Sequence, residues 1–168
     1  MLISVLGMTI LSACGGSSGG ENGVVYVYNW GEYIDPETIE MFEEETGIKV
    51  IYQTFDSNEA MMTKIEQGGT SYDIAVPSEH AISKMKDEGL LHELDHDKIP
   101  NLQYIDSRFL DLSFDEGNKY SIPYFWGTVG IAYNTKMLPD MKFTSWNDLW
   151  SKELENQILL VDGAREVM

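Results

Sequence analysis

The alternation of strand-like and helix-like segments between residues 24 and 89 constrains the fold more than any other feature of the sequence. Short β-branched and aromatic runs of this kind are typical of strands buried on both faces of a sheet. The predicted strands are VVYVYN at 24–29, IKVIYQTF at 48–55 and YDIAVP at 72–77, and the helices that follow them end at Gly47, at Gly68-Gly69 and at Gly89. This pattern predicts an α/β fold with a mostly parallel, doubly wound sheet and helices on both faces.

The predicted helices begin at residues suited to helix starts. Asp35 can cap the first helix and Pro36 fits its first position, while Ser78 can cap the third helix. The acidic run at 43–45 is expected to be a solvated face of the first helix. These signals place the loops that lead from each strand into its helix.

Beyond residue 90 the pattern is weaker. The predictions there are surface connections at 90–119, an extended segment at 120–134, a short helix capped by Ser145, a buried strand at 158–162 and a helix that begins at Ala164. Trp146 and Trp150 lie four residues apart, on one face of the short helix, and we expect them to pack.

The N-terminus has the pattern of a secretory signal. Residues 1–14 form an apolar stretch too short to span a bilayer and end in LSAC, which resembles a lipoprotein lipobox with Cys14 as the lipidated residue. The Gly/Ser-rich segment 15–23 is predicted to be a flexible tether. No Lys or Arg precedes the apolar stretch, unlike a usual signal, and a buried N-terminal strand with an incidental cysteine is the alternative.

Composition excludes several function classes. Eleven basic and 28 acidic residues give a net charge of −17, which argues against nucleic acid or an anionic membrane surface as a partner and favours a cation. The alternative is that the acidic surface only confers solubility. A single cysteine excludes a disulfide within the chain and a four-cysteine metal site, and the common nucleotide-binding and hydrolase motifs are absent. We therefore expect no cofactor, no metal and no catalytic residue.

The candidate binding site lies in the loops that follow the predicted strands. Ligands of open parallel sheets bind beyond the carboxyl ends of the strands. The loop residues selected by this rule are Trp30, Gly31, Tyr33, Ser78, His80, Asp162 and Glu166. Aromatic faces and carboxylates together suit an organic cation, because rings attract ammonium groups and carboxylates form charge-assisted hydrogen bonds with them.

Each of these residues also has a simpler interpretation. Trp30 can be part of the core, Ser78 can serve only as a helix cap, and His80 can be a solvated residue at a helix start. Glu166 can be a surface charge in a first helical turn. The triplet Asp-His-Asp at 95–97 is a weak metal signal without further ligands.

Six stretches carry a resemblance to a known family. They are YNWGEYI at 28–34, ETGIKVIY at 45–52, YDIAVPS at 72–78, YSIPYFWGT at 120–128, TSWNDLW at 144–150 and LLVDGAREVM at 159–168. With them the chain resembles the front half of the spermidine/putrescine-binding proteins of bacterial ABC uptake systems, which have a periplasmic-binding-protein-like fold.

The resemblance implies two lobes that close on a polyamine and deliver it to membrane permease subunits without chemistry, outside the cytoplasm. It implies a first lobe at 24–125, and a crossover with an incomplete second lobe at 126–168. Trp30 and Tyr33 would line the path of the polyamine, and Glu166 rather than Glu32 would hold an amine.

The chain departs from the family pattern at two site positions. His80 replaces an aromatic residue of the best-known members, and Gly163 replaces an acidic one. Both changes leave the preferred polyamine open. Because half of the cleft is expected to be missing, we also expect this chain to bind polyamine weakly or not at all.

Two other functions remain open at this point. A carbohydrate receptor would use the same aromatic and acidic groups, although a net charge of −17 does nothing to attract a neutral sugar. A glycoside hydrolase would need paired carboxylates such as Glu32 and Glu166.

Overall fold

The computed structural model of the chain describes residues 20–161. The chain divides into two compact units, Met1–Pro77 and Ser78–Met168. The lobe boundary predicted at residues 125–126 does not coincide with this division and stays a prediction. Among the described helices, none is long and apolar enough to cross a membrane.

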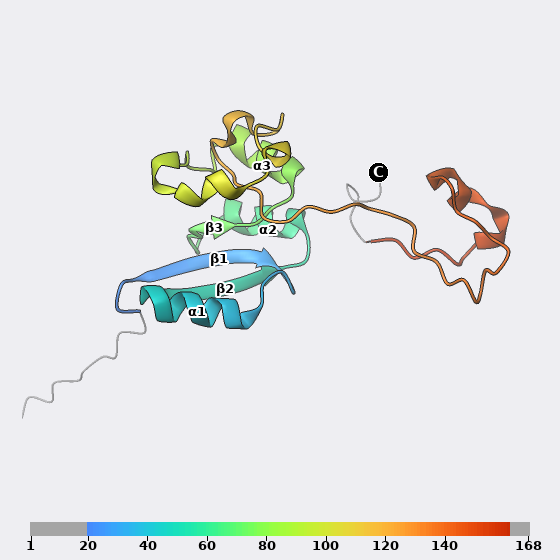
Figure 1. The fold of residues 1–168 in the computed structure, drawn as a ribbon, viewed down its shortest axis with the longest axis horizontal. Coiled ribbons are helices and arrows are strands. Elements are labelled where there is room, and N and C mark those ends of the chain that lie inside the picture. The colour runs from blue at the N-terminus through green and yellow to red at the C-terminus, as the bar shows by residue number, and fades with distance from the viewer. Residues whose placement is uncertain (1–19, 162–168) are drawn as a thin grey trace, which may run out of the picture. The chain divides into compact units, whose positions relative to one another are not determined.

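A three-stranded parallel sheet forms the centre of the first unit (Figure 1). Its strands are β1 (Val24–Trp30), β2 (Lys49–Phe55) and β3 (Ile74–Ala75), in the order β2-β1-β3. β1 and β2 pair along their whole length, from Val24 opposite Lys49 to Trp30 opposite Phe55. The predicted parallel sheet is confirmed.

The third strand is shorter than predicted. β3 has two residues instead of the six at 72–77, although backbone bonds to β1 continue on both sides of it. The N–H groups of Asp73 and Val76 donate to the carbonyls of Tyr26 and Tyr28 at 3.0 and 2.9 Å. Among the described strands, β3 has a neighbour on one side only, so less pairing holds it extended.

Two helices connect these strands. α1 (Pro36–Thr46) joins β1 to β2, and α2 (Asn58–Gln67) joins β2 to β3. The first connection leads from β1 to β2 on one side of it, and the second leads from β2 past β1 to β3 on the other side. Because such crossovers are right-handed, α1 and α2 must cover opposite faces of the sheet, as Figure 1 shows. The doubly wound arrangement is confirmed.

The helix ends of the first unit follow the sequence. The Asp35 side chain accepts a hydrogen bond from the Glu37 N–H at 3.0 Å, and Pro36 occupies the first turn of α1. Gly47 ends α1 with φ of 69°, a left-handed conformation that glycine adopts without steric cost. Ser57 caps α2 by accepting from the Ala60 N–H at 3.1 Å. These local signals set the direction in which the chain leaves each strand.

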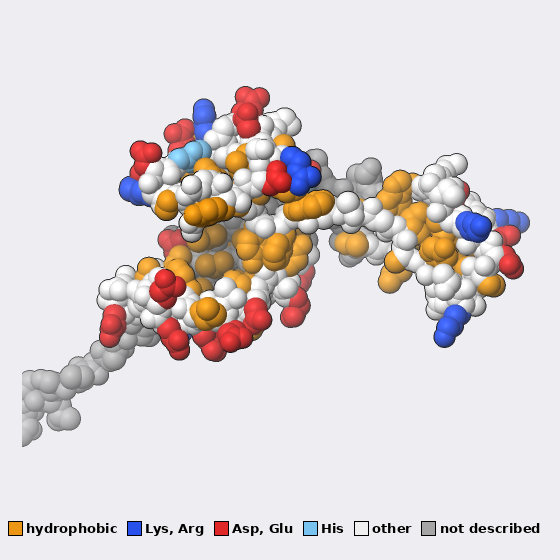
Figure 2. All heavy atoms as spheres, in the orientation of Figure 1, with side chains coloured by type: hydrophobic (Ala, Val, Ile, Leu, Met, Phe, Trp, Pro, Cys, Tyr) orange, Lys and Arg blue, Asp and Glu red, His pale blue; other side chains and the backbone are white. Residues whose placement is uncertain are grey.

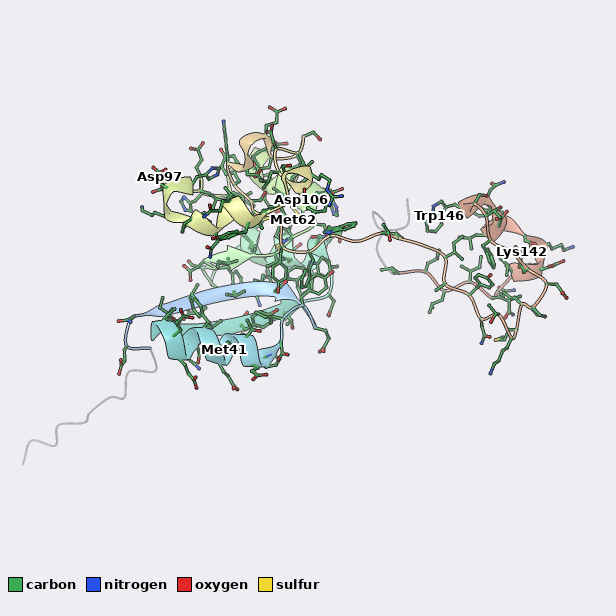
Figure 3. All side chains as sticks on the ribbon, viewed as in Figure 1. Met41, Met62, Asp97, Asp106, Lys142 and Trp146 are labelled. Atoms are coloured by element: carbon green, nitrogen blue, oxygen red, sulfur yellow. The ribbon has the colours of Figure 1, made fainter. Side chains whose placement is uncertain are left out.

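The core of the first unit is aromatic and rich in methionine. Tyr28, Phe55, Met61 and Met62 are buried, and Figure 3 labels Met62. The Tyr28 ring meets Phe55 edge-on at 5.0 Å and stacks on Tyr72 at 4.4 Å. The core is therefore concentrated at the carboxyl ends of the strands, where the candidate site begins.

The second unit opens with α3 (Glu79–Asp87), which buries Ala81, Ile82 and Met85. Within 90–119, where the sequence predicts surface connections, the structure has four 3-10 helices, at His96–Lys98, Pro100–Tyr104, Ser107–Phe109 and Glu116–Asn118. The buried Asp115 carboxylate joins them to the following segment. It accepts from the N–H groups of Tyr120 and Ser121 and from the Ser121 hydroxyl, at 3.1, 2.8 and 2.7 Å.

Two predictions for residues 122–161, the buried strand and the packing of the two tryptophans, are wrong in the described structure. The segment contains no strand, and Leu159 in the predicted buried strand is 96% exposed. Trp146, labelled in Figure 3, and Trp150 do not pack and are 55% and 85% exposed. The predicted strand has no strand to pair with in the described part of the second unit. Trp146 and Trp150 lie in a 3-10 helix, in which residues four apart do not share a face.

The short helix in this segment is confirmed, as a 3-10 helix at Trp146–Trp150. Ser145 caps it in a capping box, in which the Asp148 carboxylate accepts from the N–H groups of Thr144 and Ser145 at 2.6 and 2.9 Å. These two N–H groups hold the pKa of Asp148 below its ordinary value.

Candidate functional site

Trp30 and Tyr33 meet at the carboxyl end of β1. Their ring centroids are 6.1 Å apart, and both rings are partly accessible. The connecting loop turns at Glu32, which has a positive φ of 58°, before Asp35 starts α1. Apart from its two chain neighbours, a Cβ at Gly31 would meet no atom within 4 Å, so this part of the loop is open.

Strand pairing places a second aromatic ring against Trp30. Phe55 is opposite Trp30 in the register of β1 and β2, and their ring centroids lie 4.6 Å apart. The Tyr52 hydroxyl donates to the Trp30 carbonyl at 3.4 Å. Trp30 is therefore both a partial core residue and a wall of the candidate site, so the two interpretations of this residue are compatible.

An ammonium group already binds the far end of this aromatic surface. Lys64 Nζ lies 4.9 Å from the Tyr28 ring centroid and 5.6 Å from that of Tyr72, and it donates to Gln53 Oε1 at 3.0 Å. The neighbouring Tyr72 hydroxyl, together with the charge interactions with both tyrosines, raises the pKa of Lys64. Tyr28 and Tyr72 thus hold an alkylammonium group, within the same aromatic cluster that reaches Trp30 through the buried Phe55. The sequence reasoning missed this site, because its residues are far apart along the chain.

Ser78 and His80 lie in the second unit, at the start of α3. Ser78 occupies the N-cap position, and its carbonyl accepts from the N–H groups of Ala81 and Ile82 at 2.9 and 3.1 Å. Ser78 is therefore the N-cap residue, as predicted, although its side chain makes no capping hydrogen bond.

The position of His80 also differs from the expectation of a solvated residue. The side chain is half-buried, and its Nε2 atom is buried without a hydrogen-bond partner among the described residues. A buried ring nitrogen without a partner loses its hydration, which costs about 1–3 kcal/mol. This cost is a reason to consider His80 for ligand contact.

The two predicted carboxylates of the site, Asp162 and Glu166, lie outside the described residues, as does Cys14. The structure therefore brings together Trp30, Gly31 and Tyr33 in the first unit, and Ser78 and His80 in the second. The acidic part of the site remains a prediction.

The triplet at 95–97 has a structural role. His96 Nε2 is 2.7 Å from the Asn118 carbonyl, and Asp95 forms an ion pair with Lys98 at 2.9 Å. A pocket beside the triplet is lined by Glu93, Leu94, Asp95, His96, Asp97 and Lys119. Within the described residues no three potential ligands lie close enough to hold a metal ion.

Comparison with known proteins identifies the class. The family of bacterial extracellular solute-binding proteins matches residues 37–168, and the chain belongs to this family. A spermidine/putrescine-binding periplasmic protein of Haemophilus influenzae is 47% identical over 148 residues, which cover 87% of this chain and 41% of the relative. One from Salmonella typhimurium is 43% identical over 148 residues, covering 88% and 42%.

A solved structure agrees with these relatives. The chain is similar to a putative spermidine/putrescine ABC transporter from Listeria monocytogenes, with a TM-score of 0.82 and 70% identity. The match covers 86% of this chain and 45% of the Listeria chain. The chain thus spans less than half the length of these relatives. The periplasmic-binding-protein-like α/β fold is confirmed.

Proposed function

We propose that this chain contributes to the substrate-binding component of a polyamine ABC uptake system, located outside the cytoplasm. The observation that carries the proposal is the Trp30–Tyr33 ring pair at the carboxyl end of β1, with a surface behind it that already holds the Lys64 ammonium. The names of the relatives support the same ligand class. Nothing in these relatives favours a carbohydrate receptor or a glycoside hydrolase.

We assign each site residue a binding role according to its chemistry. Trp30 and Tyr33 cover the methylene chain and attract an ammonium group, and each such contact is worth about 0.5–2 kcal/mol. Glu166 and Asp162 supply carboxylates for the amines, while Ser78 and His80 contribute polar contacts from the start of α3. The net charge of −17 steers the cation to the protein. The ligand then passes unchanged to membrane permease subunits.

Titration of the chain with putrescine, spermidine and spermine, with maltose as a neutral control, tests the proposal. Chemical-shift changes detect binding even when it is weak, as we expect for a chain that spans less than half of its relatives. The polyamines should shift residues around Trp30 and Tyr33, and the effect should decrease as ionic strength rises. Equal responses to maltose and to the polyamines, or polyamine shifts confined to residues away from Trp30 and Tyr33, would refute the assignment.

A matched pair of tryptophan substitutions localises the site. Trp30→Ala should weaken polyamine binding about tenfold, since it removes about 1.4 kcal/mol of ring contact. Trp150→Ala removes the same side chain from an 85% exposed position and should leave binding unchanged. Equal losses from both substitutions would contradict a site at the end of β1.

We further propose that Cys14 carries the lipid that anchors the protein to the outer face of the membrane. The LSAC sequence before the Gly/Ser-rich segment supports this assignment. Metabolic labelling with a radioactive fatty acid should mark the chain, and Cys14→Ser should abolish the label. A label that persists in the variant would exclude lipidation at this residue.

A further inference from the structure

The outer edge of β2 has no neighbour among the described strands. The Lys49 N–H donates to the Gly23 carbonyl at 2.9 Å, on the side of β1. Because successive residues of a strand point their N–H groups to opposite sides, those of Val50, Tyr52 and Thr54 point outward. Such a row of outward N–H and carbonyl groups is a template for pairing with another strand.

The side chains of β2 suit strand pairing unusually well. The segment VIYQTF at 50–55 is β-branched and aromatic, and it contains no charge, no proline and no glycine. Uncharged six-residue segments of high β-propensity are those that associate with identical copies of themselves. A strand of this composition at a sheet edge needs protection.

Glu43 of α1 covers this edge. Its Oε1 accepts a hydrogen bond from the outward N–H of Val50 at 2.7 Å, and its Oε2 accepts from Lys49 Nζ at 2.8 Å. Both contacts, with the Lys49 hydrogen bond the larger cause, lower the pKa of Glu43, so the carboxylate stays charged at neutral pH. The expectation that Glu43 is merely part of a solvated helix face is therefore wrong.

The end of α1 fixes the position of Glu43. The left-handed Gly47 turns the chain directly from the last turn of the helix into β2, and its N–H donates to the Glu43 carbonyl at 2.8 Å. Glu44, the next residue, is exposed. Figure 2 shows the acidic side chains gathered on the α1 side of the first unit. Of the three glutamates at 43–45, Glu43 is thus the one placed against the strand edge.

We propose that Glu43 blocks strand addition at β2, and that removal of its carboxylate exposes an edge that pairs with β2 of a second copy of this chain. Two identical edges related by a two-fold axis meet antiparallel, so each copy offers the same outward groups to the other. The negative net charge opposes such association, which therefore becomes stronger when salt screens the repulsion.

Sedimentation velocity of the full chain at raised salt tests the proposal with three variants. Glu43→Ala should raise the association constant at least about tenfold over the unsubstituted chain, a change of about 1.4 kcal/mol. Glu44→Ala removes the same charge from the same helix and should have no such effect. In Glu43→Ala/Val50→Pro the outward N–H is also removed, as an edge strand tolerates, and the association should return to its starting value.

The double variant separates strand pairing from simple destabilisation. If Glu43→Ala associates because the first unit unfolds, the added proline will not restore the starting value and the proposal fails. It fails also if Glu43→Ala associates no more than Glu44→Ala does. Stronger association in Glu43→Ala alone, reversed by the proline, supports pairing at the β2 edge.

Discussion

Phe55 is the residue through which the fold supports the candidate site. Its buried ring lies 4.6 Å from Trp30 and 5.0 Å from Tyr28, so it connects the binding edge of β1 to the core. Phe55→Leu retains an apolar side chain at this position but removes both ring contacts. The substitution therefore isolates the aromatic contribution to stability from that of burial.

The size of the effect follows from these two contacts. Aromatic pairs contribute about 0.5–1.5 kcal/mol each beyond the burial of their surface, so Phe55→Leu should reduce the free energy of unfolding by about 1–3 kcal/mol. If the free energy of unfolding decreases by about 2 kcal/mol per molar urea, the urea midpoint of Phe55→Leu should be lower by about 0.5–1.5 M. Phe55→Ala also creates a cavity and should cost about 3–5 kcal/mol.

Urea unfolding followed by circular dichroism measures these differences. Phe42→Leu is the matched control, because Phe42 is 39% exposed on α1, and it should change stability by less than about 0.5 kcal/mol. Polyamine binding should also weaken in Phe55→Leu, since the support of Trp30 is lost. If Phe55→Leu and Phe42→Leu are equally mild, the aromatic contacts do not hold the binding edge.

Two further predictions concern charge. Lys64→Met should lower the urea midpoint at pH 7. Because the pKa of Lys64 is raised in the folded state, the difference in midpoint between the variant and the unsubstituted chain should disappear as the pH rises through that pKa. A difference that stays constant with pH would exclude a charge effect. The pKa of Asp148 is lowered in the folded state, so its carboxylate stabilises residues 144–150 at pH values above its pKa in the unfolded chain. This contribution is lost as the pH falls through the pKa of the folded state. The protection factors for amide exchange in 144–150, which are corrected for the intrinsic pH dependence of exchange, should therefore fall in acid. In Asp148→Asn they should already be low at neutral pH; a variant as protected as the unsubstituted chain would show that the capping box is not needed.

The sequence by itself determined the local structure of the first unit. Asp35, Pro36 and Gly47 set the ends of α1 through side-chain capping and backbone conformation, which depend on neighbouring residues only. Strand patterning likewise predicted β1 and β2 and, through the rule for parallel sheets, the position of Trp30 and Tyr33.

Only the tertiary structure decided which side chains meet. The support of Trp30 by Phe55 depends on strand register, and the capture of Lys64 by Tyr28 and Tyr72 depends on the packing of α2. The same holds for Glu43, which any sequence pattern assigns to a solvated face but which the turn after α1 places on the β2 edge. The predicted burial of the strand at 158–162 was wrong for a related reason. Apolar residues favour burial, but a strand is buried only where a neighbouring strand pairs with it. Local signals act through a few bonds along the chain, and contacts between distant residues exist only once the fold has formed.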